Sequence, residues 1–236
     1  MIVHQLPLSL NWSDQATFSN FQIANNRLVV AQLQQFLNTD AATATNRPVC
    51  FCLQGEHGTG LSHLLYAACH YIHQQGKSAV YLPLQPDAAK LALLEGVEQL
   101  TLVCWDNVET VAGDARWEEA LFHSYNRIQA SKGRLLIASH TPIAQAGWRL
   151  PDLASRLLAG NVFTVVPLGD EEKLKALQKR AQLRGLHLSS EVGGYLLQHV
   201  SRDMPALLAY LDRLDTASLA SQRRLTIPFI KQVLEL

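Results

Sequence analysis

The sequence is poor in the features that would place a protein in a membrane or on a nucleic acid. It has no run of about eighteen consecutive apolar residues, so no segment is expected to span a bilayer. Its 20 basic and 20 acidic side chains give a formal net charge of zero, so no global basic field would attract DNA. The start of the sequence lacks the basic and apolar regions of a signal peptide. We therefore expect a cytoplasmic protein that meets DNA only indirectly and does not contact a membrane.

Metal-binding and disulfide motifs are also scarce. The sequence has only four cysteines, Cys50, Cys52, Cys69 and Cys104. No C-x-x-C pair or regular framework connects them, which favours buried free thiols in a reducing cytosol. His70 and His73 lie close together, but no carboxylate or third ligand accompanies them, so solvent-facing or capping roles are favoured over a metal site.

The sequence does contain the pattern of a folded α/β protein, with 48% hydrophobic and 17% charged residues. Apolar runs predict strands at 49–53, 78–82, 100–105, 134–139 and 162–166. Helical patterns separate these runs, which indicates a five-stranded parallel sheet with right-handed crossovers and flanking helices. After Pro167 the patterns are helical only, at 170–184, 190–200, 205–221 and 227–235. We expect three parts: an extended peptide over 1–12, an α/β core over 13–167 and a small all-helical domain over 168–236.

Some local signals refine this outline. Asn25 and Asn26 are candidate caps for a helix with Leu28 and Phe36 among its apolar residues. The segment 86–95 predicts a short helix. Asp114 is placed to cap a longer helix after the third strand.

A glycine-rich stretch after the first predicted strand carries the clearest chemical signal. Gly55, Gly58 and Gly60 stand between an apolar run and a helical pattern, and the spacing matches the phosphate-binding motif G-x-x-x-x-G-K-[ST] except that Leu61 replaces the lysine. The glycines let backbone N–H groups approach phosphate oxygens, and Ser62 is the residue expected to hold Mg²⁺. A glycine-rich turn without a ligand is the alternative, but the spacing favours nucleotide binding.

The end of the third strand supports this interpretation and limits it. Asp106 closes an apolar run, as a magnesium-linked acidic residue does in a phosphate-loop protein. The next residue is Asn107, and an amide cannot accept a proton from an attacking water at neutral pH. With Leu61 in place of lysine as well, two groups that serve hydrolysis are absent. We expect a nucleotide-binding protein whose intrinsic ATPase activity is weak or absent.

The amino-terminal segment allows two interpretations. Gln5, Leu6, Leu8 and Leu10 surround Pro7, which holds the segment extended. An edge strand or a loose terminus would account for the pattern. So would a short linear ligand, with an amide head and apolar anchors for a pocket on another protein.

Beyond these general patterns, the motifs resemble those of the DnaA-like AAA+ family, named for the bacterial replication initiator. The resemblance begins with Thr17-Phe18-x-Asn20-Phe21 and the loop Gly55-x-x-Gly58-Thr59-Gly60-x-Ser62-His63-Leu64-Leu65. It continues through Trp105-Asp106-Asn107, Glu119, Phe122, Asn126-Arg127, Ser139 and Leu153-Ala154-Ser155-Arg156-Leu157. It covers the sequence from about residue 12 but includes no counterpart of the helix-turn-helix domain of DnaA. Together with the Gln-Leu-x-Leu-x-Leu segment, this is similar to the Hda family of DnaA-homologous regulators.

The resemblance implies a role for each matching position. Gln5, Leu6, Leu8 and Leu10 would bind the DNA polymerase III sliding clamp, its beta subunit. Arg156 would be an arginine finger given in trans to ATP on DnaA, although a surface arginine without this role is the alternative. The helical domain would be the AAA+ lid. The residues implied in nucleotide binding are Phe21, Gly55, His57, Gly58, Thr59, Gly60, Leu61, Ser62, His63, Asp106, Asn107, Ser139 and Pro205.

The departures from the family pattern point in one direction. The lid arginine of the family falls at Pro205 here, although nearby Arg202 could replace it. Without that arginine and without the lysine at Leu61, less charge would be neutralised at a γ-phosphate. The expected nucleotide is therefore a diphosphate such as ADP, with Mg²⁺ held by Ser62 and Asp106 if it is present.

Two other functional classes remain as alternatives. A DnaC-like helicase-loading AAA+ ATPase would need hydrolysis, which Leu61 and Asn107 disfavour. A DNA-binding protein would use the basic lid residues Lys173, Lys175, Lys179, Arg180 and Arg184, but such a run is usually a solvated helix face. The leading prediction is an inhibitor of replication initiation that joins the clamp to DnaA; self-association stays open.

Overall fold

The computed structural model describes residues 16–39 and 49–235. The strands are β1 (Cys50–Gln54), β2 (Ala79–Pro83), β3 (Leu102–Asp106), β4 (Arg134–Ser139) and β5 (Asn161–Thr164). The helices are α1 (Arg27–Asn38), α2 (Leu61–Gln74), α3 (Ala115–Ala130), α4 (Pro151–Leu158), α5 (Asp170–Leu183), α6 (Ser190–His199), α7 (Met204–Ser221) and α8 (Ile227–Leu234). Short 3-10 helices are η1 (Ala24–Asn26), η2 (Ala88–Leu94), η3 (Val97–Gln99), η4 (Val108–Val111) and η5 (Ile143–Gln145).

The five strands form one parallel sheet in the order β2-β3-β4-β1-β5. The register pairs Gln54 with Ser139 and Pro83 with Asp106, so the carboxyl ends of the central strands meet at one edge. The predicted five-stranded parallel sheet is confirmed. Because the loop after β1 leaves from this edge, the glycine-rich stretch lies beside the ends of β3 and β4.

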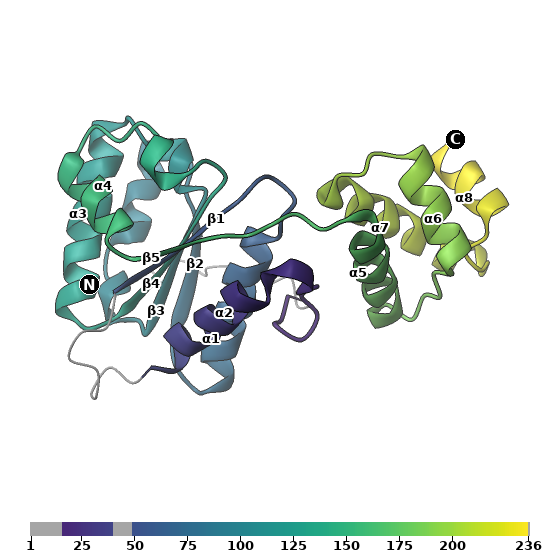
Figure 1. Cartoon of the computed structure of the whole chain (residues 1–236), viewed down its shortest axis with the longest axis horizontal. Coiled ribbons are helices and arrows are strands. Elements are labelled where there is room, and N and C mark those ends of the chain that lie inside the picture. The colour runs from purple at the N-terminus through teal and green to yellow at the C-terminus, as the bar shows by residue number, and fades with distance from the viewer. Residues whose placement is uncertain (1–15, 40–48, 236) are drawn as a thin grey trace, which may run out of the picture.

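Helices cover both faces of the sheet, as Figure 1 shows. On one face α1 and α2 pack against side chains such as Phe51, Cys104 and Leu136. On the other face α3 and α4 pack against side chains such as Trp105 and Ile137. The central strands are buried except for Gln54 at the end of β1, which explains why they read as continuous apolar runs.

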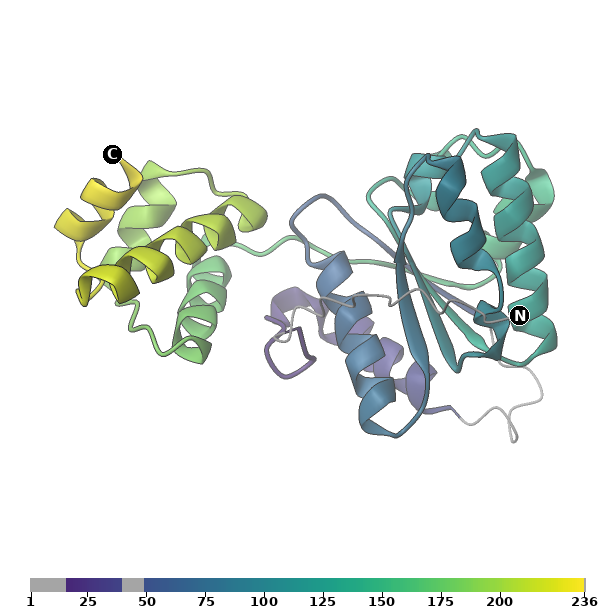
Figure 2. The same cartoon turned by 180° about the vertical axis from the view of Figure 1, so that it is seen from behind.

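The helices α5 to α8 form a separate layer with its own core, which includes Leu177, Leu211, Leu214 and Ile230. They lie at one end of the elongated molecule, beyond α1 and α2, and the segment after β5 leads into them (Figures 1 and 2). Pro205 and Pro228 both fall in a first helical turn, as expected for a residue without an N–H to donate.

Several local predictions can be compared with the structure. The capping role of Asn26 is wrong, because its amide pairs with Val166 through two hydrogen bonds of 2.8 and 2.9 Å and ties α1 to the segment before the lid. Leu28 is exposed and outside the core. The helix at 86–95 is the 3-10 helix η2. Asp114 caps α3, as predicted.

The remaining expectations concern thiols and the membrane. All four cysteines are buried and free, as predicted, and burial raises the pKa of the Cys50 and Cys104 thiols. Across residues 16–39 and 49–235, each helix is too short or too polar to cross a bilayer.

Candidate nucleotide site

The glycine-rich loop joins β1 to α2, and its glycines are required by close contacts. A Cβ on Gly55 would lie 2.7 Å from the carbonyl oxygen of Val165, which no side chain tolerates. Gly60 has a φ of 92°, and a Cβ there would lie 2.9 Å from the ring of Phe21. The loop therefore follows a path that only these small residues allow, and its backbone is open to a ligand.

The helix α2 begins directly after this loop, and no side chain caps its amino end. The first N–H groups of a helix have no partner within the helix, and together with the helix dipole they favour an anion. Leu61, which stands where a lysine would hold phosphate, is only 1% exposed and packs in the core. The structure thus retains the backbone part of a phosphate site and lacks its point charge.

A cleft of about 480 Å³ opens between this loop and the lid, which is the size of a small-molecule site. Nine of the thirteen residues predicted to bind nucleotide line it: Phe21, His57, Gly58, Thr59, Gly60, Leu61, Ser62, His63 and Pro205. The cleft also has walls that the motif did not indicate. They include Tyr66 on α2 and Ala176, Lys179 and Arg180 on α5.

Aromatic rings line the α2 side of the cleft. Phe21 is almost fully buried, and its ring centroid lies 5.4 Å from that of His63. His63 donates a hydrogen bond from Nε2 to the carbonyl oxygen of Thr17 at 3.0 Å. Burial lowers the pKa of His63, so this imidazole is neutral at pH 7. His63 therefore fixes the segment around Thr17 and adds no positive charge for a phosphate.

Two further imidazoles meet at the loop. The rings of His57 and His140 stack with centroids 3.9 Å apart, and both line the cleft. His140 also donates from Nδ1 to the carbonyl oxygen of Gly55 at 3.1 Å. This pair of imidazoles connects the loop to the residue that follows β4.

Asp106 lies beside Ser62 at the end of β3, as the motif predicts, but it is fully buried and already accepts three hydrogen bonds. Its Oδ2 accepts hydrogen bonds from the hydroxyls of Ser62 and Tyr81, both at 2.6 Å. Its Oδ1 accepts the backbone N–H of Asn107 at 3.0 Å. The Tyr81 hydroxyl stands where a magnesium site needs a free carboxylate oxygen, so these residues do not fit the predicted ion.

Four predicted residues do not line the cleft, namely Gly55, Asp106, Asn107 and Ser139. The Ser139 hydroxyl is fully buried and donates to the carbonyl oxygen of Thr141, at 2.5 Å. Asn107 has a left-handed backbone conformation and directly precedes η4. Arg202 does not replace the missing lid arginine, because its guanidinium pairs with Asp170 and with the carbonyl oxygen of Leu197.

The lid contributes two cations that the sequence did not single out for nucleotide binding. Lys179 and Arg180 on α5 line the cleft, and Lys179 donates to the carbonyl oxygen of Ser19 at 2.5 Å. Within the described part of the chain, the buried Nε of Arg180 has no hydrogen-bond partner. Burial, followed by the nearby Arg184, lowers the pKa of Arg180. The helical pattern suggested a solvated basic face here, and only the packing of lid on core turns it inward.

Arg156 lies on the α3 and α4 side of the sheet and does not line the cleft. Its guanidinium lies 4.5 Å above the ring of Phe122 and donates to the side-chain oxygen of Asn126. The ring of Tyr125 is 5.6 Å away. The arginine is half-buried and has no carboxylate among these neighbours. It is therefore an oriented cation on a surface away from the protein's own phosphate loop.

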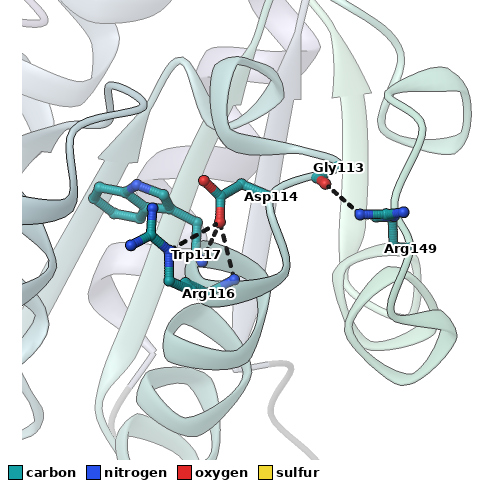
Figure 3. A network of polar contacts seen from close by, with 5 residues as sticks. All are labelled: Gly113, Asp114, Arg116, Trp117 and Arg149. Carbon is teal, nitrogen blue, oxygen red and sulfur yellow. Dashed lines mark hydrogen bonds and ion pairs between the residues drawn. The ribbon is translucent and has the colours of Figure 1, made fainter.

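A buried carboxylate fixes the segment that carries Arg156. Glu118 on α3 is 1% exposed and accepts the backbone N–H groups of Gly113, Arg149 and Leu150 at 2.6 to 3.0 Å. Figure 3 shows the neighbouring contacts, in which Arg149 reaches the Gly113 carbonyl oxygen and Asp114 caps α3. The sequence pattern gave no sign of Glu118, because a helical glutamate is usually exposed.

Comparisons with known proteins agree with this architecture. Residues 170–234 match the family model described as "Hda, lid domain". Domain III of the Thermotoga maritima replication initiation protein DnaA is similar, with a TM-score of 0.79, 18% identity, and coverage of 94% of this chain and 96% of that chain. AMPPCP-bound DnaA from Aquifex aeolicus has a TM-score of 0.67 and 21% identity, over 84% of this chain and 64% of that chain.

A more distant structure belongs to the same architecture. The RuvB Holliday junction branch migration motor of Thermotoga maritima has a TM-score of 0.61 and 14% identity, over 89% of this chain and 68% of that chain. The chain therefore has the fold of DnaA domain III, and its last four helices match the model of the Hda lid domain. This confirms the relationship that the motifs indicate.

Proposed function

We propose that this DnaA-like AAA+ chain regulates replication initiation by stimulating the hydrolysis of ATP bound to DnaA. The observation that carries the proposal is the position of Arg156, which lies outside the protein's own cleft on the α3 and α4 side. There Phe122 and Asn126 hold the guanidinium in one orientation. A cation held in this way suits a nucleotide on a neighbouring molecule.

The chemistry of such a contact is electrostatic. A guanidinium that reaches the phosphates of a bound ATP stabilises the charge that develops on the transferred phosphoryl group. In GTPases an arginine supplied in trans accelerates hydrolysis by roughly 10³–10⁵-fold. The chain would act on its partner in this way while hydrolysing little ATP itself, since Leu61 removes the lysine and Asn107 cannot act as a base.

The second half of the proposal is a link to the replication machinery. Gln5, Leu6, Leu8 and Leu10 lie outside the described residues, so the proposal that they bind the sliding clamp rests on their sequence pattern. An extended peptide with an amide head and apolar anchors suits a pocket on another protein. Binding to the clamp would place this cytoplasmic regulator beside DnaA on replicating DNA.

The cleft would hold a nucleotide of the regulator's own, and ADP is favoured over ATP. The loop offers backbone N–H groups but no lysine, and Arg202 is turned away to Asp170. The acidic side chain of Asp203 lies beside the loop, within 2.8 Å of where a Cβ on Gly58 would be. A γ-phosphate would add negative charge beside a loop that has no lysine, and of the two lid cations in the cleft Lys179 is already bonded to the carbonyl oxygen of Ser19. Calorimetry that gave much tighter binding of ATP than of ADP would contradict this preference.

The experiment that tests the function measures ATP hydrolysis by ATP-loaded DnaA in the presence of clamp-loaded DNA. The native chain should stimulate turnover, and Arg156→Ala should reduce it to the level without the chain. Gln5→Ala should also lose stimulation, because the clamp is no longer engaged. Arg116→Ala is the matched control, since Arg116 is an exposed arginine on α3 whose ion-pair partner, Asp114, lies on its own helix cap.

Two results would overturn the proposal. Full stimulation by both Arg156→Ala and Gln5→Ala would remove the basis for an adaptor. Strong ATP hydrolysis by the isolated chain, without DnaA, would instead favour a self-sufficient motor such as a helicase loader. Binding of ADP to each variant, measured by calorimetry, shows whether the nucleotide cleft is intact when stimulation is lost.

A further inference from the structure

The carboxylate at the end of β3 has a partner that no phosphate-binding motif requires. Tyr81 lies on β2, next to β3, and the register pairs it with Cys104. Because side chains two apart on a strand share a face, Tyr81 and Asp106 point to the same side of the sheet. The Tyr81 hydroxyl therefore reaches Oδ2 of Asp106, at 2.6 Å.

The rest of the carboxylate is also occupied. Ser62 donates to the same oxygen at 2.6 Å, and the backbone N–H of Asn107 donates to Oδ1 at 3.0 Å. Asp106 has no exposed surface, so neither oxygen is open to the cleft. Within residues 16–39 and 49–235, no cluster of three or more His, Cys, Asp or Glu side chains could hold a metal ion.

A second ring holds Tyr81 in this place. Tyr66 on α2 stacks on Tyr81 with centroids 4.1 Å apart and an interplanar angle of 23°, and Tyr66 lines the cleft. The Tyr81 hydroxyl thus lies between α2 and β3, and the ring stacked on Tyr81 belongs to Tyr66, which lines the cleft. To bind a metal, Asp106 would have to give up a hydrogen bond from a side chain that is stacked on Tyr66.

We propose that nucleotide binds in this cleft without a divalent cation, because the Tyr81 hydroxyl satisfies the carboxylate that would otherwise need one. The inference rests on the proposed binding of a nucleotide and adds to it the metal requirement. A magnesium ion normally offsets the charge of an acidic residue and of the phosphates together. Here hydrogen bonds from Ser62, Tyr81 and Asn107 disperse the charge of Asp106, and the loop N–H groups and α2 meet the phosphates.

This assignment agrees with the other features of the cleft. Backbone N–H groups and a helix end can neutralise the smaller charge of a diphosphate more completely than that of a triphosphate. A triphosphate without a metal ion or a lysine in the loop would keep more of its charge uncompensated. Binding without a metal ion and a preference for ADP are therefore two results of the same arrangement.

The test measures the dissociation constant of ADP by isothermal titration calorimetry, once with excess Mg²⁺ and once with EDTA. For the native chain the two values should agree within about threefold. Tyr81→Phe removes only the hydroxyl and frees one oxygen of Asp106, so Mg²⁺ should tighten ADP binding by about tenfold or more in this variant. Tyr71→Phe is the matched control, because the Tyr71 hydroxyl contacts exposed Asn38 and not Asp106.

Each other outcome overturns the inference. If the dissociation constant of ADP for the native chain rises about tenfold or more in EDTA, nucleotide binding needs a metal ion. A Tyr81→Phe variant that stays insensitive to Mg²⁺, with its melting temperature retained, shows that the hydroxyl does not exclude the ion. Absence of ADP binding under both conditions would overturn this inference together with the nucleotide part of the proposed function, whereas stimulation of DnaA by Arg156 is measured separately and could persist.

Discussion

The two faces of the sheet differ in the charged side chains that they carry and in how those side chains are held. On the α2 and lid side, the carboxylate of Asp106 is buried under three hydrogen bonds, and the place of the usual lysine is taken by the core residue Leu61. On the α3 and α4 side, Arg156 is half-buried on aromatic rings with its guanidinium oriented by Asn126. The first face lacks the lysine of a phosphate loop, and the second carries an oriented arginine outside the cleft.

This difference separates two functions that an ATPase combines, namely nucleotide binding and the stabilisation of charge during hydrolysis. In a phosphate-loop ATPase the groups that bind nucleotide and those that promote hydrolysis converge on one ligand. Here the binding elements are the backbone of the loop and the amino end of α2, whereas the oriented arginine lies on the other side. The two sides should then respond separately to mutation, which the following changes test.

The largest effect should come from Gly55→Ala. The new Cβ would lie 2.7 Å from the Val165 carbonyl oxygen, so the loop must shift, at a cost of about 1–3 kcal/mol in stability. ADP binding, measured by calorimetry, should weaken about tenfold or more, because the N–H groups move with the loop. Gly194→Ala is the control: it lies in α6 with nothing within 4 Å of the new Cβ, and it should retain ADP binding. Equal ADP affinity of the two variants would contradict the proposal that the backbone of this loop binds the phosphates.

A change on the opposite face should have a similar effect on stability but none on the binding of ADP. Glu118→Gln replaces a carboxylate oxygen by an amide donor that faces the N–H groups of Gly113, Arg149 or Leu150. Denaturant unfolding should show a loss of about 1–3 kcal/mol, and stimulation of DnaA should fall because α4 is less well fixed. The control is Glu119→Gln, whose exposed side chain only approaches His123, at 3.8 Å.

The cap of α3 should make a still smaller contribution. Asp114 accepts the N–H groups of Arg116 and Trp117, as Figure 3 shows. Asp114→Ala should cost about 1 kcal/mol in the free energy of unfolding, measured in urea. Asp114→Ser supplies another capping oxygen and should recover most of the loss. If serine and alanine destabilise the chain equally, the side-chain oxygen is not what stabilises the helix.

The smallest effect is a pH dependence on the nucleotide side. Burial lowers the pKa of His63 in the folded chain, so the unfolded chain binds the proton more readily. The stability that this neutral imidazole contributes is present above the unfolded pKa of about 6.5 and declines as the pH falls below it. Urea unfolding between about pH 5 and 8 should show this decline, and His63→Gln should show less of it. Identical slopes for the two proteins would argue against the lowered pKa.

Local sequence patterns determined the strands, the phosphate-loop motif and several helix starts of this protein. The strands read as apolar runs because both of their faces are covered, and β4 begins and ends where the sequence predicts. The glycines, Ser62 and Asp106 were found because a phosphate loop imposes fixed spacing on one continuous stretch. Asp114 and Pro205 were placed correctly at helix starts, since caps depend on the nearest few residues.

Only the tertiary structure decided which of these groups meet. Tyr81 contacts Asp106 because β2 pairs with β3 in one register, and nothing near Tyr81 in the sequence indicates that neighbour. Glu118 is buried because the segment before α4 brings three N–H groups to it. Arg180 faces the cleft only because the lid packs against the core. These contacts depend on long-range packing, whereas periodicity and capping depend on local geometry, and for that reason the sequence by itself determined the elements and the fold determined the site.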